Sequence, residues 1–134
     1  MIRIKKHKNF SLIRNQKSHI LQFGQFGLKN LNPLLVKEKQ LSTFFWILNQ
    51  CLRKLALKNN VKIWKTINLN LTLTKLSLES RMGKGKGNFY STAIFLKPGK
   101  ILCEIDNIEY SNLKKISKFL NKKFSGKLII VSRF

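Results

Sequence analysis

The sequence predicts an α+β fold, a two-layer sandwich in which two helices pack on a mainly antiparallel sheet. Two segments place apolar residues at the three-and-four spacing of an amphipathic helix, and other segments alternate apolar and polar residues as strands do. The 134 residues suffice for one hydrophobic core and are too few for two independent domains. We therefore divide the chain into a basic arm, residues 1–20, and one α+β domain, residues 21–134.

The arm lacks a sustained apolar period, and it carries cations without acids. Its candidate RNA contacts are Lys5, Lys6, Lys8 and Arg14. Such a segment is expected to have little structure alone and to become ordered on a polyanion. An organellar presequence has a similar composition and is the alternative, but we favour an arm that stays attached.

The first helix is predicted from Leu41 onward, with Ser42 as its N-cap and with Asn59 and Asn60 ending it. Its buried stripe consists of Leu41, Phe44, Phe45, Leu48, Leu52 and Leu55. The second helix is predicted from Ile108 to Phe124. Its buried side consists of Leu113, Ile116, Phe119 and Leu120, and five lysines face solvent or RNA: Lys114, Lys115, Lys118, Lys122 and Lys123.

Four segments are predicted to be strands. Val61–Asn68 keeps a period of two that Lys65 interrupts, and Lys127–Arg133 is a closing strand. Phe89–Leu96 and Lys100–Asp106 are expected to pair as a hairpin on the first helix. Pro98-Gly99 would make the turn between them, because Pro fixes φ and Gly accepts a positive φ.

The charge indicates the partner. Lys and Arg number 27 against five acids, a formal charge of +22. Such a surface repels itself, and a nucleic acid relieves the repulsion while releasing counterions. A solvated surface without a ligand and attachment to an anionic membrane are the alternatives, but cations interleaved with apolar residues along the chain favour a domain embedded in RNA. No apolar stretch is long enough to span a bilayer.

A glycine-spaced basic segment is the most informative motif. It consists of Arg81, Met82, Gly83, Lys84, Gly85, Lys86, Gly87 and Asn88. The missing Cβ atoms let backbone amides approach a phosphate, the lysines supply charge, and Arg81 offers a planar fork. The segment is neither a Walker P-loop nor a dinucleotide GxGxxG motif. A mobile hairpin tip, in which the glycines only make the turn, is the alternative.

A second glycine-spaced segment precedes the first helix. Its candidate RNA contacts are Phe23, Gly24, Phe26, Gly27 and Lys29. The two phenylalanines are suited to stacking on unpaired bases, and they are equally suited to anchoring the core.

These segments, with Lys62-Ile63-Trp64 and Lys97-Pro98-Gly99-Lys100 running on to Glu104, resemble the bacterial-type L16 family of large-subunit ribosomal proteins. The resemblance runs from about Gln22 to the C-terminus, and it adds Lys62 to the candidate RNA contacts. It implies a structural protein that binds large-subunit rRNA near the base of the central protuberance. It also implies a role in organising the aminoacyl-tRNA site, with the basic loop presented to tRNA.

The chain departs from the family pattern in three places. It carries a few extra residues between Leu28 and Leu41, and the usual prolines are replaced by Leu69, Thr72 and Ser77. The first helix is crowded with large apolar residues where the family has Ala and Arg. A neighbouring ribosomal protein is therefore a candidate to cover Trp46 and Ile47.

An enzyme is the competing class, as an RNA-processing nuclease, and a free RNA-binding module is a third. The close carboxylates, Glu104, Asp106 and Glu109, could hold a divalent ion, but ion pairs or solvated charge are the favoured reading among so many lysines. His7 and His19 lie in or beside the arm, where a phosphate contact is expected. Cys51 and Cys103 lack metal-ligand spacing and are expected to be reduced and buried. We therefore expect no catalysis, cofactor or metal.

The abundance of Lys, Asn, Ile and Phe is typical of an AT-rich coding sequence. Together with the bacterial-type motifs, it indicates the ribosome of a mitochondrion. A plastid and the cytoplasm of an AT-rich bacterium are the alternatives.

Overall fold

The computed structural model describes residues 19–55 and 60–133. The elements, in chain order, are β1 (Phe26–Asn30), β2 (Leu34–Lys37), α1 (Glu38–Leu55), β3 (Lys62–Lys65), β4 (Leu71–Lys75), β5 (Asn88–Leu96), β6 (Ile101–Asp106), α2 (Tyr110–Lys123) and β7 (Leu128–Ser132). Almost all of the predicted arm lies outside the described residues. Within them, no helix is both long enough and apolar enough to cross a bilayer.

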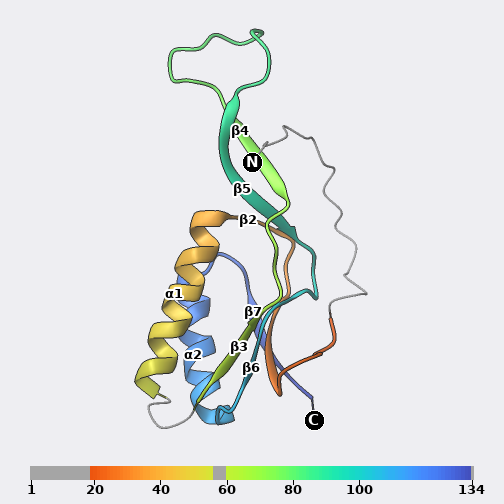
Figure 1. Cartoon of the computed structure of the whole chain (residues 1–134), viewed down its shortest axis with the longest axis vertical. Coiled ribbons are helices and arrows are strands. Elements are labelled where there is room, and N and C mark those ends of the chain that lie inside the picture. Colours follow the sequence, from red (N-terminus) through yellow and green to blue (C-terminus); the bar gives the residue numbers. More distant parts are fainter. Residues whose placement is uncertain (1–18, 56–59, 134) are drawn as a thin grey trace.

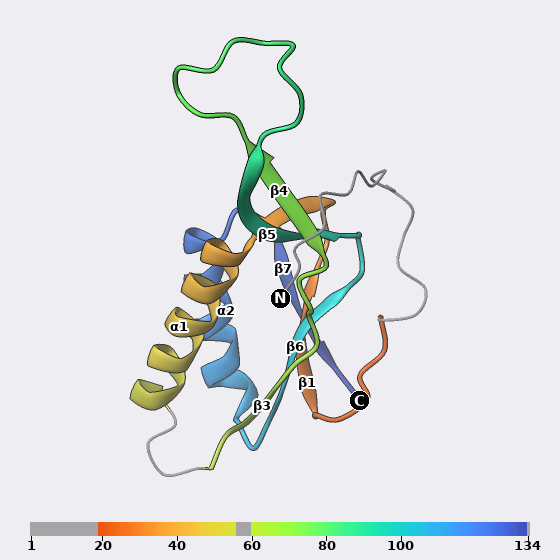
Figure 2. The same cartoon turned by 45° about the horizontal axis from the view of Figure 1, so that its top comes forward.

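The strands form two antiparallel sheets. One has four strands in the order β3-β6-β1-β7, and the other has three in the order β2-β5-β4. The helices lie side by side on one face of the four-stranded sheet, and the three-stranded sheet extends from one end of the body (Figures 1 and 2). The predicted α+β sandwich is confirmed, with two sheets in place of the single one expected.

The core lies between the helices and the four-stranded sheet. Residues paired across neighbouring strands share a face, so Ile63, Ile105 and Phe26 form one row that points toward the helices. From the helices, Leu48 and Leu113 reach full burial against this face. The predicted stripe of the first helix is confirmed at Leu41, Phe44, Phe45, Leu48 and Leu52, all of which are buried.

Two residues assigned to the buried stripes are exposed. Leu55 is 40% exposed at the end of α1, and Phe119 is 45% exposed on α2. Both lie beside the line where the two helices meet, on the side away from the sheet. The periodicity identified both helices correctly, but it included one exposed residue in the buried stripe of each helix.

The first helix begins at Glu38, before the predicted start. The strand β2 runs directly into it, and the backbone N–H of Lys37 donates to Oε1 of Gln40 at 3.1 Å. This contact is the glutamine half of a capping box, so Ser42 lies inside the helix and is not its cap. The predicted end at Asn59 falls outside the described residues.

The predicted hairpin of β5 and β6 is wrong, although both strands and the turn between them exist. Gly99 has φ of 88°, and the N–H of Lys100 donates to the carbonyl of Lys97 at 3.2 Å. The carbonyl of Asn30 accepts from the N–H of Gly99 at 2.7 Å, which ties the turn to the end of β1. Each strand has its own two neighbours, β2 and β4 for β5, and β3 and β1 for β6. The turn therefore passes the chain from one sheet to the other.

Glu104 holds residues 22–24, which precede β1, against the four-stranded sheet. It lies on the face away from the helices, in a row with Trp64 and Gly27, and is only 2% exposed. Its carboxylate accepts from the backbone N–H groups of Gln22 at 3.1 Å, Phe23 at 2.6 Å and Gly24 at 2.7 Å. The favoured interpretation of Glu104 as an ion-paired or solvated charge is therefore wrong, because the carboxylate is buried and accepts hydrogen bonds from backbone amides.

We expect Glu104→Ala to lower the free energy of unfolding by roughly 3 kcal/mol, because three backbone donors, one of them buried, lose a charged acceptor. Glu104→Gln retains one acceptor oxygen and should lose less. Urea unfolding followed by circular dichroism measures both. Glu79→Ala, in an exposed loop, is the control for removing one negative charge. Equal unfolding midpoints for Glu104→Ala and Glu79→Ala would contradict this role.

The two cysteines are free thiols in different environments. Cys103 is fully buried as predicted, and burial raises its pKa to about 12. Cys51, predicted to be buried, is half-buried; burial raises its pKa and the nearby Lys54 opposes that rise. Because the thiolate is the reactive form, Cys51 is the more reactive of the two.

A disulfide reagent at pH 8 should therefore label only Cys51 in the folded chain, and its rate should increase with pH as more thiolate forms. Cys103 should react only after unfolding in denaturant. Mass spectrometry of tryptic peptides assigns each label. Labelling of both thiols at one rate in the native chain would show that Cys103 is accessible.

Candidate RNA interface

The basic glycine-spaced segment lies in the loop that joins β4 to β5, residues 76–87. This loop projects beyond the three-stranded sheet and away from the helices (Figure 1). All its residues are exposed except Gly87, and Leu78 and Met82 are 98% and 95% exposed. The loop therefore presents its whole length to a ligand.

Glycines shape the loop in two different ways. Gly83 and Gly85 have φ of 92° and 88°, and each is in open space, so they provide backbone conformations that other residues rarely adopt. A Cβ on Gly87 would lie 2.5 Å from the carbonyl carbon of Lys75, so glycine is required where the two strands separate. Lys84 and Lys86, placed between these glycines, have no bulky neighbours on either side.

A cluster of cations surrounds the base of the loop, and the sequence analysis missed it. The ring of Tyr90 is 54% exposed, and the Nζ atoms of Lys75 and Lys37 lie 5.3 Å and 5.8 Å from its centroid. The three residues come from β4, β2 and β5. A period-two pattern in Leu71–Lys75 could have identified β4, but only the sheet pairing brings Lys37 to this place.

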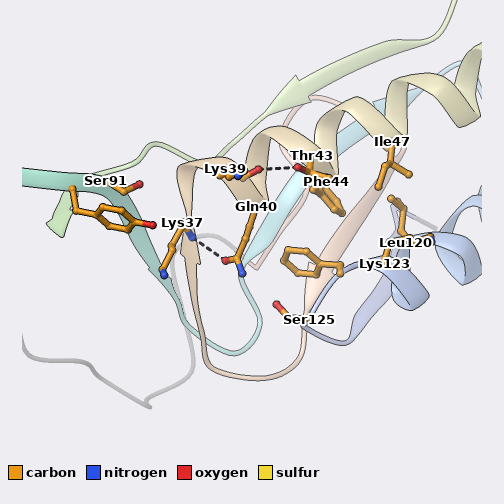
Figure 3. A pocket seen from close by; sticks show the side chains of 12 residues that line it. Lys37, Lys39, Gln40, Thr43, Phe44, Ile47, Ser91, Leu120, Lys123 and Ser125 are labelled. Carbon is orange, nitrogen blue, oxygen red and sulfur yellow. Dashed lines mark hydrogen bonds between the residues drawn. The ribbon is translucent and has the colours of Figure 1, made fainter. Parts of the chain in front are cut away.

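A cavity of about 590 Å³ continues this surface toward the helices. Figure 3 shows it between the start of α1, the end of α2 and β5, with Lys37, Lys39 and Lys123 around it. Phe44 and Phe124 form its apolar side, with their ring centroids 5.1 Å apart. None of its described lining residues is acidic. Ammonium groups beside aromatic rings suit a phosphate with its ribose or base.

The second glycine-spaced segment lies at the opposite end of the molecule, where β1 begins beside the chain's C-terminal end (Figure 1). Phe26 is buried in the core, which is one of the two alternatives that the sequence left open. Phe23 is 58% exposed and stacks on Trp64 with ring centroids 6.2 Å apart. Of these two phenylalanines, Phe23 alone is exposed enough to stack on an unpaired base.

The glycines of this segment serve close packing of the chain on itself. A Cβ on Gly24 would lie 3.0 Å from the carbonyl oxygen of Ile105, and one on Gly27 would lie 2.5 Å from the side chain of Leu21. Lys29 is half-buried in β1, and Lys62 is exposed at the start of β3. The structure thus separates the predicted contacts of the loop from those on or beside the four-stranded sheet. Lys5, Lys6, Lys8 and Arg14 lie outside the described residues.

The carboxylates do not assemble into a metal site. Glu104 is occupied by backbone amides, and Asp106 accepts from the N–H of Asn107 at 2.9 Å. No group of three or more His, Cys, Asp or Glu side chains that could hold a metal occurs in the described part of the chain. Both carboxylates are therefore engaged by backbone N–H groups.

Sequence comparison identifies the class of protein. A family model described as ribosomal protein L16p/L10e matches residues 3–131. The large ribosomal subunit protein uL16m of Chondrus crispus is 44% identical over 133 residues, which cover 98% of this chain and 96% of that protein. The large ribosomal subunit protein uL16 of Pseudothermotoga lettingae is 33% identical over 113 residues, 84% of this chain and 76% of its own length.

The chain therefore belongs to the ribosomal protein L16p/L10e family. It is a structural protein of the ribosome and not an enzyme, which sets aside the nuclease alternative.

Proposed function

We propose that the chain binds large-subunit rRNA and helps to organise the aminoacyl-tRNA site, with the loop of residues 76–87 directed at RNA. The projecting loop carries this proposal. It combines exposed cations, glycines that uncover backbone amides, and an absence of packing partners around Gly83 and Gly85.

The chain is a structural constituent of the large ribosomal subunit, as its family membership indicates. The relative from Chondrus crispus carries the name uL16m, which marks the mitochondrial form. The mitochondrial ribosome is accordingly the location of this chain, in agreement with its AT-biased composition.

Two parts of the basic surface suit two kinds of RNA contact. Lys37, Lys75 and Tyr90 are mounted on paired strands, so they suit an RNA that stays in place, such as folded rRNA. The loop tip makes few contacts of its own and can adapt to an RNA that arrives and leaves, such as tRNA. Arg81, Lys84 and Lys86 supply its charges; Met82 lies between the first two, and Asn88 follows the third.

The far end of the molecule supplies a second contact in this proposal. Phe23 offers an exposed ring, and Lys29 in β1 and Lys62 at the start of β3 offer charge. Gly24 and Gly27 act indirectly, by letting the segment lie flat on the sheet. The basic arm, residues 1–20, would extend this contact, with residues 21–134 as the single RNA-binding domain.

Replacing Lys84 and Lys86 by Ala should weaken RNA binding by roughly tenfold, because two charge-assisted phosphate contacts are lost. The unfolding midpoint should not change, since both side chains are exposed and outside the core. Translation in the organelle should slow at tRNA accommodation, or large-subunit maturation should stall. Translation rate and subunit profiles on sucrose gradients measure the two effects.

The matched control replaces Lys114 and Lys118 by Ala, which removes the same charge from exposed positions of α2 that do not line the basic cavity. That variant should translate and assemble normally. If the loop variant does so too, the loop has no role in RNA binding.

The logarithm of the binding constant of the purified chain for rRNA transcripts should decrease linearly with the logarithm of salt concentration. Each neutralised phosphate contributes a slope of about −0.9 on a duplex and about −0.7 on a single strand. The loop variant should therefore have a slope less steep by about 1.4 to 1.8. Filter binding over a salt series measures it. An unchanged slope would show that Lys84 and Lys86 neutralise no phosphate.

A further inference from the structure

An apolar groove runs between the two helices on the side away from the sheet. Trp46, Ile47 and Leu55 line it from α1, and Ile116 and Phe119 line it from α2. Its cavity measures about 580 Å³, and the Trp46 side chain is 64% exposed. A large aromatic ring left open beside Phe119 and Leu55 is unusual on a soluble domain and typical of a binding surface.

The groove has a charged rim of one sign. Lys54, Lys115 and Lys123 lie among its lining residues, and none of the described lining residues is acidic. The rim therefore attracts negative groups at both ends of an apolar centre. The same lysines repel the basic arm, residues 1–20, so charge disfavours the arm as the segment that fills the groove.

The chemistry of the groove favours a protein over RNA. An RNA base requires hydrogen-bonding partners at its edges, but Ile47, Leu55 and Ile116 offer only aliphatic surface. The basic cavity of Figure 3, by contrast, adds the hydroxyls of Thr43, Ser91 and Ser125 to its lysines, and no described lining residue of the groove carries a hydroxyl. Aliphatic and aromatic side chains are the groups that gain most from burial in this groove.

Its geometry favours a helical occupant. On α1, Trp46, Gln50 and Lys54 follow one another four residues apart, as do Lys115, Phe119 and Lys123 on α2. Two such rows of side chains leave a channel along which the apolar stripe of a third helix can pack.

We propose that this groove binds an amphipathic helical segment of another large-subunit protein, with large apolar residues flanked by Asp or Glu. The apolar residues fill the space beside Trp46 and Phe119, and the acids face Lys54, Lys115 and Lys123. The proposal rests on membership in the large subunit and is independent of what the loop binds.

The test replaces Trp46 by the photo-crosslinker p-benzoylphenylalanine in the chain and irradiates purified large subunits. The expected adduct is sensitive to protease and resistant to ribonuclease, and mass spectrometry should map it to a segment with acids beside apolar residues. The same substitution at Phe119 should capture the same segment. At Met82, on the loop tip, it should not.

Four results would overturn the proposal: an adduct with rRNA, an adduct within the same chain, an adduct to a segment without acids, or no adduct above the unirradiated sample. Absence of the chain from large subunits would instead contradict its place in the ribosome, so the two failures are distinguishable.

Charge reversal separates docking from mere proximity. Lys54→Glu with Lys115→Glu should lower the crosslink yield per incorporated chain by about tenfold, because rim attractions become repulsions. Lys114→Glu with Lys118→Glu makes the same change on exposed positions of α2 that do not line the groove, and the yield should stay as in the parent. Equal loss in both variants would show that the rim does not select the partner.

Discussion

The positive charge of the chain is the constraint on which the rest of the structure depends. Five acids cannot neutralise 27 cations, and three of the five accept hydrogen bonds from uncharged groups. Glu104 accepts from backbone amides, Glu38 accepts from the hydroxyl of Thr92 at 2.7 Å, and Asp106 accepts from Asn107. The repulsion is visible at Lys100, where burial and then the neighbouring Lys97 lower the pKa. Neutralisation therefore has to come from outside the chain.

The architecture keeps this charge away from the core. The helices and the four-stranded sheet contain the buried side chains, and the three-stranded sheet extends the loop from one end (Figure 2). The strand β5 connects the core to the base of the loop. Ala93 and Ile94 in its second half are buried, and Asn88 and Tyr90 in its first half are exposed. The loop can consequently change its conformation without disturbing the packing on which stability depends.

Short sequence patterns correctly predicted the features that depend on neighbouring residues, namely the buried side of a helix and the position of a turn. The periodic leucines and phenylalanines of α1 specified its buried side, and Pro98-Gly99 specified a turn. The turn could not specify which strands pair, because that choice depends on β1, β2, β3 and β4 from distant parts of the chain. The strand β1 was missed because Gly27 and Asn30 weaken its pattern. Likewise, the spacing of Lys84 and Lys86 identified the loop, but the cluster of Lys37, Lys75 and Tyr90 exists only after three strands have come together.

The pair of helices has two chemically different sides that meet along one line. Ile47 and Lys123 border both the basic cavity and the apolar groove. The surface changes from Lys37 at the end of β2 and Lys39 in the first turn of α1 to Trp46 two turns later, although RNA binding alone would favour cations along the whole helix. Exposed apolar surface costs free energy in water and gains none from phosphates. A boundary of this kind is therefore consistent with helices that face RNA at one end and a protein partner along the groove.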